Sequence, residues 1–475
     1  MKTKILSVLM LAALSLPLMA GIHSYTSHSV LESGKWVKIR VSESGVCCMS
    51  FSEIQSAGID PQQLRVFGYG GAQKLQDFSK PNIDDLPQVP VFVGDNYVLF
   101  WVQGPISWTY DANNGRFTHT RNTYSDYGYY FLTDNIGEML SPTYAEAVSG
   151  VPTDITTYPH YQVHDYDSLN LIDRTGISGG GRTFYGEQFK AGQTRSFSFP
   201  TPNAVTTEKT KMYMELAAYA SDASTFKATA NGTNGSVYLQ KVPDFYTFGV
   251  AGSISISPNS QANTQSVQIQ LQNSLAGALG WLNFIEVTTP STLTMTGSYM
   301  PVRTLVNRGE ETPVRFHLSG ANANIQVWDI TNLAAIKRMQ TSLTNDTLIW
   351  TGTQADGVHE YVAVNTNGSQ FVNAEVVGTV ANQNLHQLSN IDYVIICPVG
   401  YEEQATRLAQ AHEAKQGITW TVVNDQQVYN EFSSGTPDAT AYRWLMKMLY
   451  DRANGTSITK PRWLLLMGHG SFDNR

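Results

Sequence analysis

The stretch DYVIICPVGYEEQATRLAQAHEAKQGITWTVVN, residues 392–424, decides the fold of the carboxyl-terminal part of this 475-residue chain. It begins with a continuous apolar run, which is typical of a strand buried on both faces. Residues 401–417 predict a helix, because acids occupy the first turn, Ala405, Leu408 and Ala409 form a small apolar face, and Gly417 ends it. Residues 418–424 predict a second strand. The order strand, helix, strand indicates a βαβ unit.

A loop is expected after the second strand, from residue 425 to 435, and a second helix and a third strand follow it. Thr436 is expected to cap a helix that Pro437 opens, and apolar side chains recur on one face at Trp444, Leu445, Met448 and Leu449. The run RWLLLMG, 462–468, predicts the third strand. This β-α-β-α-β order is half of a doubly wound α/β sheet. Because such crossovers are right-handed, the strands are parallel and their carboxyl ends meet at one edge, where ligands bind. The positions expected at or near that edge are Gly400, Asn424 and Gly468.

The rest of the chain predicts β structure. Residues 23–290 show period-two alternation, as in KWVKIRV (35–41) and SVQIQLQ (266–272), with one short helix expected at 52–57. Residues from about 291 to 380 have short strands separated by turn signals, which suggests an immunoglobulin-like sandwich. We therefore expect a multidomain chain with β-rich amino-terminal domains, barrel or sandwich, ahead of an α/β unit. The expected domains are 21–200, 201–290, 291–380 and, after a polar linker at 381–390, a partial α/β domain at 391–475.

The first twenty residues predict export. Two lysines precede an apolar run at 5–18, and PLMAG follows, which is the pattern of a secretory signal peptide rather than of a membrane span. The formal charge is −8 and only 15% of residues are charged, with no basic run, so no nucleic-acid partner is predicted. An odd number of cysteines argues against a disulfide framework: Cys47, Cys48 and Cys397.

Three arrangements compete for chemistry at the sheet edge. If the strand order is 2-1-3, Cys397 and His469 lie on neighbouring strands ~5 Å apart and could form a thiol–imidazole dyad. A cysteine that continues an apolar strand is more often inert core, since burial raises its pKa. Alternatively, His469, Ser471 and Asp473 form an acid–base cluster, although such spacing more often holds a turn. In the third arrangement this rim, Gly468 to Gly470, is only the floor of a site whose reactive groups follow residue 475.

Two other stretches contain residue types that bind ligands. YPHYQVHDYDSLN, 158–170, offers four side chains at spacings a metal accepts, but its strand-and-loop setting favours a structural role: His160, His164, Asp165 and Asp167. SGGGRTFYGE, 178–187, has a glycine run without the strand-to-helix context of a phosphate loop. We therefore predict neither a metal nor a cofactor.

Several stretches resemble the gingipain-type (C25, caspase-like) cysteine peptidases, and in particular the sortase branch that serves type IX secretion. FYGE (184–187) and EFSSGTPDATAYR (431–443) are the most specific; PRWLLLMGHGSFDNR (461–475) and the glycine-rich NLIDRTGISGGGRTFYGEQF (170–189) also match. In that branch the third strand leads into Gly-Asp-Gly-Ser-Tyr-Asp, so His469 here fills the aspartate position. The family's catalytic histidine and cysteine lie on later strands, so neither is carried onto this sequence.

The resemblance implies the amino-terminal part of an exported cysteine peptidase. Such a protein would remove carboxyl-terminal sorting signals from type IX secretion cargo and attach the cargo to the cell surface, at the outer membrane, with other secretion-complex proteins as partners. Residues 1–475 would then lack the catalytic histidine and cysteine and be silent alone. The alternative from a different class is a β-rich surface adhesin or secretion-complex scaffold without enzymatic activity.

Overall fold

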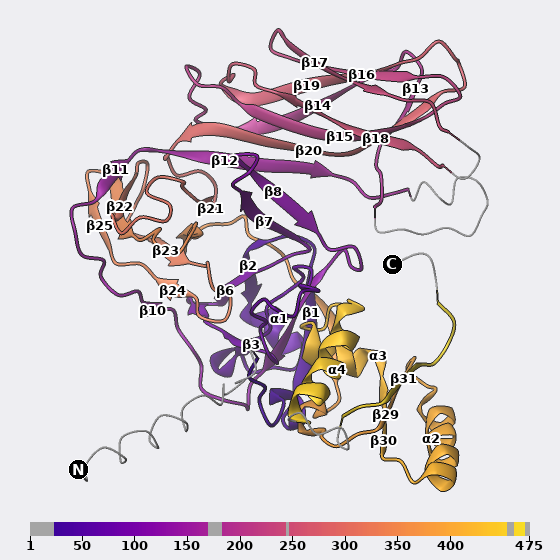
Figure 1. Ribbon diagram of the computed structural model, residues 1–475. Helices are drawn as coiled ribbons and strands as arrows, with labels where there is room; N and C mark the ends of the chain where they lie inside the picture. The colour runs from indigo at the N-terminus through magenta and orange to yellow at the C-terminus, as the bar shows by residue number, and fades with distance from the viewer. Residues whose placement is uncertain (1–22, 170–182, 244–246, 454–459, 471–475) are drawn as a thin grey trace, which may run out of the picture.

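The computed structural model describes residues 23–169, 183–243, 247–453 and 460–470. The predicted signal peptide, 1–20, lies outside these ranges. The described part contains three β units and one α/β unit (Figure 1). All its sheets are open, so the barrel that the sequence left possible is not formed and the sandwich alternative holds. No helix within the described residues combines the length and the apolar character needed to cross a bilayer.

The amino-terminal β unit packs two sheets around one core. The first sheet has the order β28-β1-β9-β3-β4, and the second β2-β6-β5. Val37, Ile39, Val98 and Phe100 are among the buried residues between them. The strands are β1 (Trp36–Val41), β2 (Gly45–Ser50), β3 (Arg65–Phe67), β4 (Gln88–Val89), β5 (Phe92–Val93), β6 (Tyr97–Val102), β9 (Gly128–Thr133) and β28 (Glu375–Val380); a hairpin of β7 (Ile106–Asp111) and β8 (Arg116–Arg121) extends from it.

The short helix expected at 52–57 is confirmed as α1 (Phe51–Ser56). Ser50 caps it: its side chain accepts a hydrogen bond from Glu53 N, and the Glu53 side chain accepts one from Ser50 N, which is a capping box. Two 3₁₀ turns, η1 (Val30–Glu32) and η2 (Pro61–Gln63), complete this unit.

The central sandwich stacks two antiparallel sheets. One has the order β12-β20-β15-β18, with β13 also on β20, and the other β14-β19-β16-β17. Alternate residues of each strand point inward, as in β14 and β19. The strands are β12 (Thr157–Asp165), β13 (Gln188–Lys190), β14 (Thr194–Thr201), β15 (Lys211–Tyr219), β16 (Ser224–Ala230), β17 (Thr233–Leu239), β18 (Val250–Ile256), β19 (Asn263–Gln272) and β20 (Leu279–Thr292).

The immunoglobulin-like unit has sheets of order β10-β24-β23-β27-β21 and β11-β22-β26-β25. Phe316 and Trp350 stack at its centre, 4.6 Å between ring centroids. The strands are β10 (Thr143–Tyr144), β11 (Thr153–Ile155), β21 (Tyr299–Val302), β22 (Val314–Leu318), β23 (Ile325–Asp329), β24 (Lys337–Arg338), β25 (Thr341–Thr344), β26 (Thr347–Gly352) and β27 (Tyr361–Asn365). Strands before residue 200 thus belong to all three β units, and β28 pairs with β1 of the first unit. The sheets are therefore not divided in the sequence at residues 200 and 380.

The α/β unit has a parallel sheet of order β30-β29-β31, so its strands are parallel as predicted and have the order 2-1-3 that the Cys397–His469 dyad would require. Its strands are β29 (Tyr393–Cys397), β30 (Trp420–Asn424) and β31 (Trp463–Leu466), and its helices are α2 (Glu402–Gln416), α3 (Asp425–Phe432) and α4 (Thr440–Arg452). Two expectations were wrong here. Residues 425–432, taken as loop, form α3, which Asn424 caps. The last helix begins at Thr440 rather than at Pro437, because Asp438 accepts the hydrogen bond from Thr440 N.

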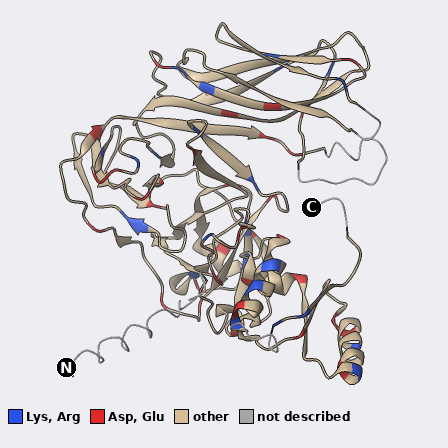
Figure 2. Ribbon diagram, in the orientation of Figure 1, with Lys and Arg blue, Asp and Glu red and all other residues tan. Residues whose placement is uncertain are grey.

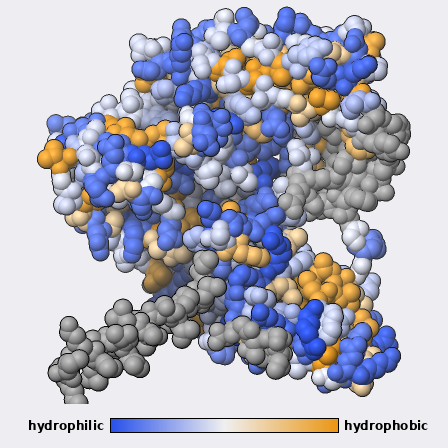
Figure 3. Space-filling view, in the orientation of Figure 1, coloured by the Kyte–Doolittle hydropathy of each residue, from blue (hydrophilic) through white to orange (hydrophobic). Residues whose placement is uncertain are grey.

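Charged side chains are sparse on the β units and denser on the helices of the α/β unit (Figure 2). An apolar patch lies over β31 in the space-filling view (Figure 3). It reflects the exposure of Trp463 (44%), Leu464 (41%) and Leu466 (53%) on a strand that is the edge of its sheet.

Candidate functional site

The carboxyl ends of β29, β30 and β31 meet at one edge, as the sequence predicted (Figure 1). Cys397, the last residue of β29, is opposite Asn424 of β30, and Ile396 is opposite Leu466 of β31. Gly468 has φ +124°, a backbone conformation that favours glycine. Ser471 and Asp473 lie outside the described residues.

The edge does not join Cys397 to His469. The thiol is buried, and its Sγ donates to Val423 O at 3.7 Å. Burial first, and then the charges of Glu402 and Asp425, raise the pKa of this thiol, so the reactive thiolate is disfavoured. His469 is exposed, and its Nδ1 lies 3.5 Å from Gly470 O. None of the three cysteines hydrogen-bonds to a histidine in the described part of the chain.

The motif EFSSGTPDATAYR attaches the α/β unit to the amino-terminal β unit. Ser434, held at φ +53°, accepts hydrogen bonds from Tyr69 N (2.9 Å) and Gly70 N (3.3 Å) and donates to Tyr129 O (3.0 Å). Two further contacts flank it. Gly435 O accepts from Lys38 Nζ at 2.7 Å, and Asp438 accepts from Lys74 N at 3.1 Å.

Both lysines at this interface are buried, and no carboxylate of the described residues pairs directly with either Nζ. Lys38 Nζ also donates to Asn430 Oδ1 (3.1 Å), and Lys74 Nζ donates to the Tyr69 hydroxyl (2.9 Å). Burial lowers the pKa of each ammonium to about 7. The motif therefore carries an interface rather than a reaction centre.

The segment expected to be a polar linker, 381–390, is instead part of the same interface, so that expectation was wrong. It forms the turn η4 (Leu385–Gln387), and His386 is fully buried in it. His386 Nδ1 lies 2.6 Å from Glu431 and Nε2 lies 3.2 Å from Asp84. Burial lowers the pKa of this imidazole, but the two carboxylates outweigh it and raise the pKa to about 9. We call this set of side chains, with Asp85, the His386 network.

The His386 network consists of residue types that bind metals, and Asp85, His386 and Glu431 come within 4.8 Å of one another. The carboxylate oxygens of Glu431 and Asp85 already accept hydrogen bonds from the protein. Glu431 accepts from Leu385 N and His386 N, and Asp85 accepts from Ser29 Oγ (2.9 Å) and Val30 N (2.7 Å). Both ring nitrogens of His386 face carboxylates. This bonding fits a buried ion-pair network better than a metal centre.

The four side chains weighed as metal ligands at 158–170 do not converge. His164 pairs with Glu187 of the FYGE motif at 2.8 Å. Asp165 pairs with His119 at 2.9 Å, and Asp167 with Arg121 at 3.2 Å. These contacts hold the β7–β8 hairpin and residues 184–187 against the sandwich. They are structural, and the remaining residue, His160, lines a cleft.

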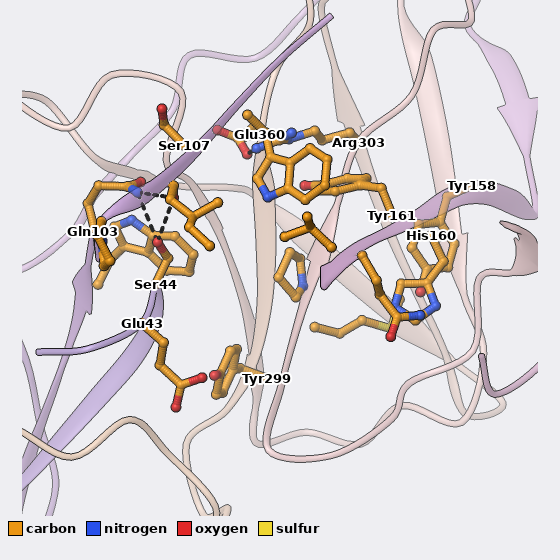
Figure 4. A pocket seen from close by; sticks show the side chains of 18 of the residues that line it. Glu43, Ser44, Gln103, Ser107, Tyr158, His160, Tyr161, Tyr299, Arg303 and Glu360 are labelled. Carbon is orange, nitrogen blue, oxygen red and sulfur yellow. Dashed lines mark hydrogen bonds and ion pairs between the residues drawn. The ribbon is translucent and has the colours of Figure 1, made fainter. Parts of the chain in front are cut away.

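That cleft, of about 460 Å³, lies where the three β units meet (Figure 4). The amino-terminal unit contributes an ordered wall, because Gln103 Nε2 donates to Ser44 Oγ (2.9 Å) and Ile106 O (2.6 Å). Across it, Arg303 is ion-paired to Glu360 and lies 4.4 Å from the Tyr161 ring. Other lining residues are Glu43, Trp101, Trp108, Tyr158, His160, Gln162 and Tyr299. Local sequence patterns do not reveal this cleft, because its walls come from five segments far apart in the chain: 42–44, 101–108, 158–163, 296–303 and Glu360.

Comparison with known proteins defines the class. Residues 386–475, which include the whole parallel sheet, match the family model of peptidase family C25. Among solved structures, dimeric latent PorU from Porphyromonas gingivalis is 31% identical with a TM-score of 0.82, over 95% of this chain and 43% of that one. This chain is therefore a PorU-like protein of peptidase family C25. It spans less than half the length of that relative.

Other matches are remote. A CBM36 domain of a xylanase from the hindgut metagenome of Trinervitermes trinervoides is 6% identical, over 27% of this chain and 96% of that one, with a TM-score of 0.18. The carboxyl-terminal CBM6 of LamC from Zobellia galactanivorans is 18% identical, over 22% and 80%, with a TM-score of 0.15. No curated protein matches the chain.

Proposed function

We propose that this chain is the amino-terminal part of an exported cysteine peptidase of the sortase type. It would act on cargo of type IX secretion, remove carboxyl-terminal sorting signals and attach the cargo to the cell surface at the outer membrane. The observation that carries the proposal is the C25 match over residues 386–475, combined with the parallel sheet of order 2-1-3 found there.

The chemistry of the family is thiolate attack on a peptide carbonyl, with a histidine moving the proton and an acyl-enzyme that water or an amine resolves. We propose that the reacting cysteine and histidine are not among residues 1–475. The support is chemical: Cys397 is buried, its pKa is raised, and it contacts a carbonyl rather than an imidazole. The exposed apolar surface of β31 supports the same proposal, since such an edge favours pairing with a further strand.

Two experiments test this. In the source bacterium, disruption of the gene is expected to leave secreted cargo with intact carboxyl-terminal signals, seen by mass spectrometry of the cargo. Correctly trimmed cargo in the disrupted strain would exclude the sortase role. Separately, purified 21–475 is expected to resist a thiol-directed activity probe. Labelling of Cys397 that is lost in Cys397→Ala would instead favour the dyad with His469.

The scaffold alternative has less support. C25 membership gives the α/β unit an enzymatic relative, and the His386 network and the EFSSGTPDATAYR motif fix that unit firmly on the β units. A secretion-complex partner and a surface location are part of the proposal, and co-purification from cross-linked outer membranes would test both.

A further inference from the structure

The cleft between the three β units is bordered by strand edges. β12 is the outer strand of its sheet, β21 is the outer strand of another, and β7 pairs only with β8. All three contribute lining residues: Ile106–Trp108 from β7, Tyr158 and His160–Val163 from β12, and Tyr299–Pro301 from β21. Figure 4 shows Tyr158, His160 and Tyr161 on β12, across the cleft from Gln103 and Ser44.

The main chain of β12 is available along this border. One side of the strand is fully paired with β20, from Thr157 to Asp165. Among the described residues, no backbone hydrogen bond links the other side of Tyr158–Val163 to any other segment. An exposed strand edge is a template for an added strand, and extended peptides bind proteins in this way.

Three polar atoms of the lining side chains are buried. Among the described residues, Trp101 Nε1, Arg303 Nε and His160 Nδ1 make no hydrogen bond, and a ligand would reach them only if the lining side chains moved. Burial lowers the pKa of His160, which keeps the imidazole neutral and able to donate or accept.

The charge of the cleft points to a basic ligand group. Arg303 is neutralised by Glu360, whereas Glu43 at the rim is exposed and has no ion pair within the described residues. Its carboxylate lies toward Tyr299 in Figure 4, and burial together with this charge raises the pKa of Tyr299 to about 12. A lysine or arginine side chain would complement Glu43.

A second cavity of about 350 Å³ shares the wall residues Trp108, Arg303 and Glu360 with the first. The first cavity, of about 460 Å³, is called the groove below. Trp108 and Tyr161, 4.8 Å apart, give it an aromatic floor.

We propose that this groove binds an extended polypeptide segment of a secreted substrate, which adds to the free strand edges and places a basic side chain against Glu43. An oligosaccharide could stack on the aromatic rings, but it would leave the main chain of β12 unpaired. The free edge therefore favours a polypeptide. The inference rests on the proposed function in one respect, namely that the bound segment comes from a secreted substrate.

The test is direct binding to purified 21–475. The probes are three fluorescent dodecapeptides of alternating valine and threonine, with lysine, glutamine or glutamate at the centre, followed by anisotropy. We expect the lysine peptide to bind about two- to fivefold more tightly than the glutamine peptide, as one rim ion pair allows, and the glutamate peptide to bind worst. A lysine peptide methylated on alternate backbone nitrogens keeps the side chains but loses the donors, and should lose at least about tenfold in affinity.

Matched variants locate the site. Glu43→Gln should abolish the preference for lysine over glutamine, whereas Glu310→Gln removes an exposed charge outside the cleft and should preserve it. Trp108→Ala should weaken all three peptides by about tenfold or more, with the melting temperature of the chain as the control for folding.

Each contrary outcome overturns the inference. Failure of all three peptides to bind wild type at about 1 mM would do so, as would equal binding of the methylated peptide. Saturable binding of a soluble xylan oligosaccharide without peptide binding would assign the groove to a glycan. A peptide-free dimer that Trp108→Ala dissociates would assign it to a second copy of the chain. Processing of cargo in the gene-disrupted strain tests the proposed function alone, whereas peptide binding tests the groove. Failure of the proposed function can therefore be distinguished from failure of this inference.

Discussion

The structure predicts that Glu431 holds the α/β unit in place. Its side chain is fully buried on α3 and accepts hydrogen bonds from Gln383 Nε2 (2.9 Å), Leu385 N (2.8 Å), His386 N (3.0 Å) and His386 Nδ1 (2.6 Å). Glu431→Gln keeps the shape but removes the charge. It leaves a buried imidazolium short of one carboxylate and places an amide N–H₂ among donors.

Removing one partner of a buried ion pair costs about 3–5 kcal/mol. Since Asp84 still faces His386 at 3.2 Å, we expect the lower end, about 3 kcal/mol, which corresponds to about a hundredfold more frequent opening of the interface. Native-state proteolysis measures this opening. The readout is the rate at which fragments cut between residues 381 and 400 accumulate, by mass spectrometry.

The control is Glu403→Gln, an exposed acid in the first turn of α2, which should cost at most about 1 kcal/mol. The pH dependence gives a second readout. His386 has a folded pKa of about 9 against 6.5 in the unfolded chain, so its stabilisation is complete below pH 6.5 and is lost as the pH rises through 9. Glu431→Gln should flatten this decline. A cleavage rate within about threefold of wild type would refute the reasoning.

Three further predictions concern the α/β unit and its interface with the amino-terminal β unit. Ser434→Ala removes the acceptor for Tyr69 N and should destabilise the interface by about 1–3 kcal/mol in chemical denaturation. No change would show that the docking loop, residues 433–439 between α3 and α4, contributes little to stability. Lys38 has a folded pKa of about 7 against 10.5, so its burial penalises the fold below pH 7 and this penalty fades as the pH rises to 10.5. Relative to Lys38→Met, the wild type should therefore gain stability over that range, and parallel pH profiles would contradict the burial argument. Cys397→Ala should leave processing by the parent protein intact and cost about 1 kcal/mol or less of stability; abolished processing would identify Cys397 as a reacting group.

The local pattern of residues 392–468 predicted much of the α/β unit. A continuous apolar run is typical of a strand covered on both faces, and the helix at 402–416 carries acids at its start and a glycine in the left-handed region at its end. The parallel order follows from the handedness of βαβ crossovers. α3 escaped prediction because DQQVYNEF is short and mostly polar, although Asn424 with Gln427 three residues later is a capping-box signal that could have revealed it.

The linker prediction failed for a different reason. ANQNLHQLSN is polar, and a polar segment is usually exposed to solvent. Gln383 and His386 are nevertheless buried against Glu431, which lies 45 residues beyond His386. Local composition cannot reveal a partner at that distance. The same limit applies to the cleft, whose residues range from Ser42 to Glu360. The pairing of β1 with β28, across more than 330 residues, is equally invisible to local pattern.

The interface explains why the most specific motif of the chain contains no reacting group. EFSSGTPDATAYR supplies Glu431 to the His386 network, Ser434 to Tyr69 and Asp438 to Lys74, so one loop satisfies buried polar groups in two units at once. Such a loop tolerates few substitutions, because each one orphans a buried donor or charge. It also fixes the orientation of the sheet edge relative to the β units. The segment between α3 and α4 is therefore a positioning element for any chemistry that the edge supports.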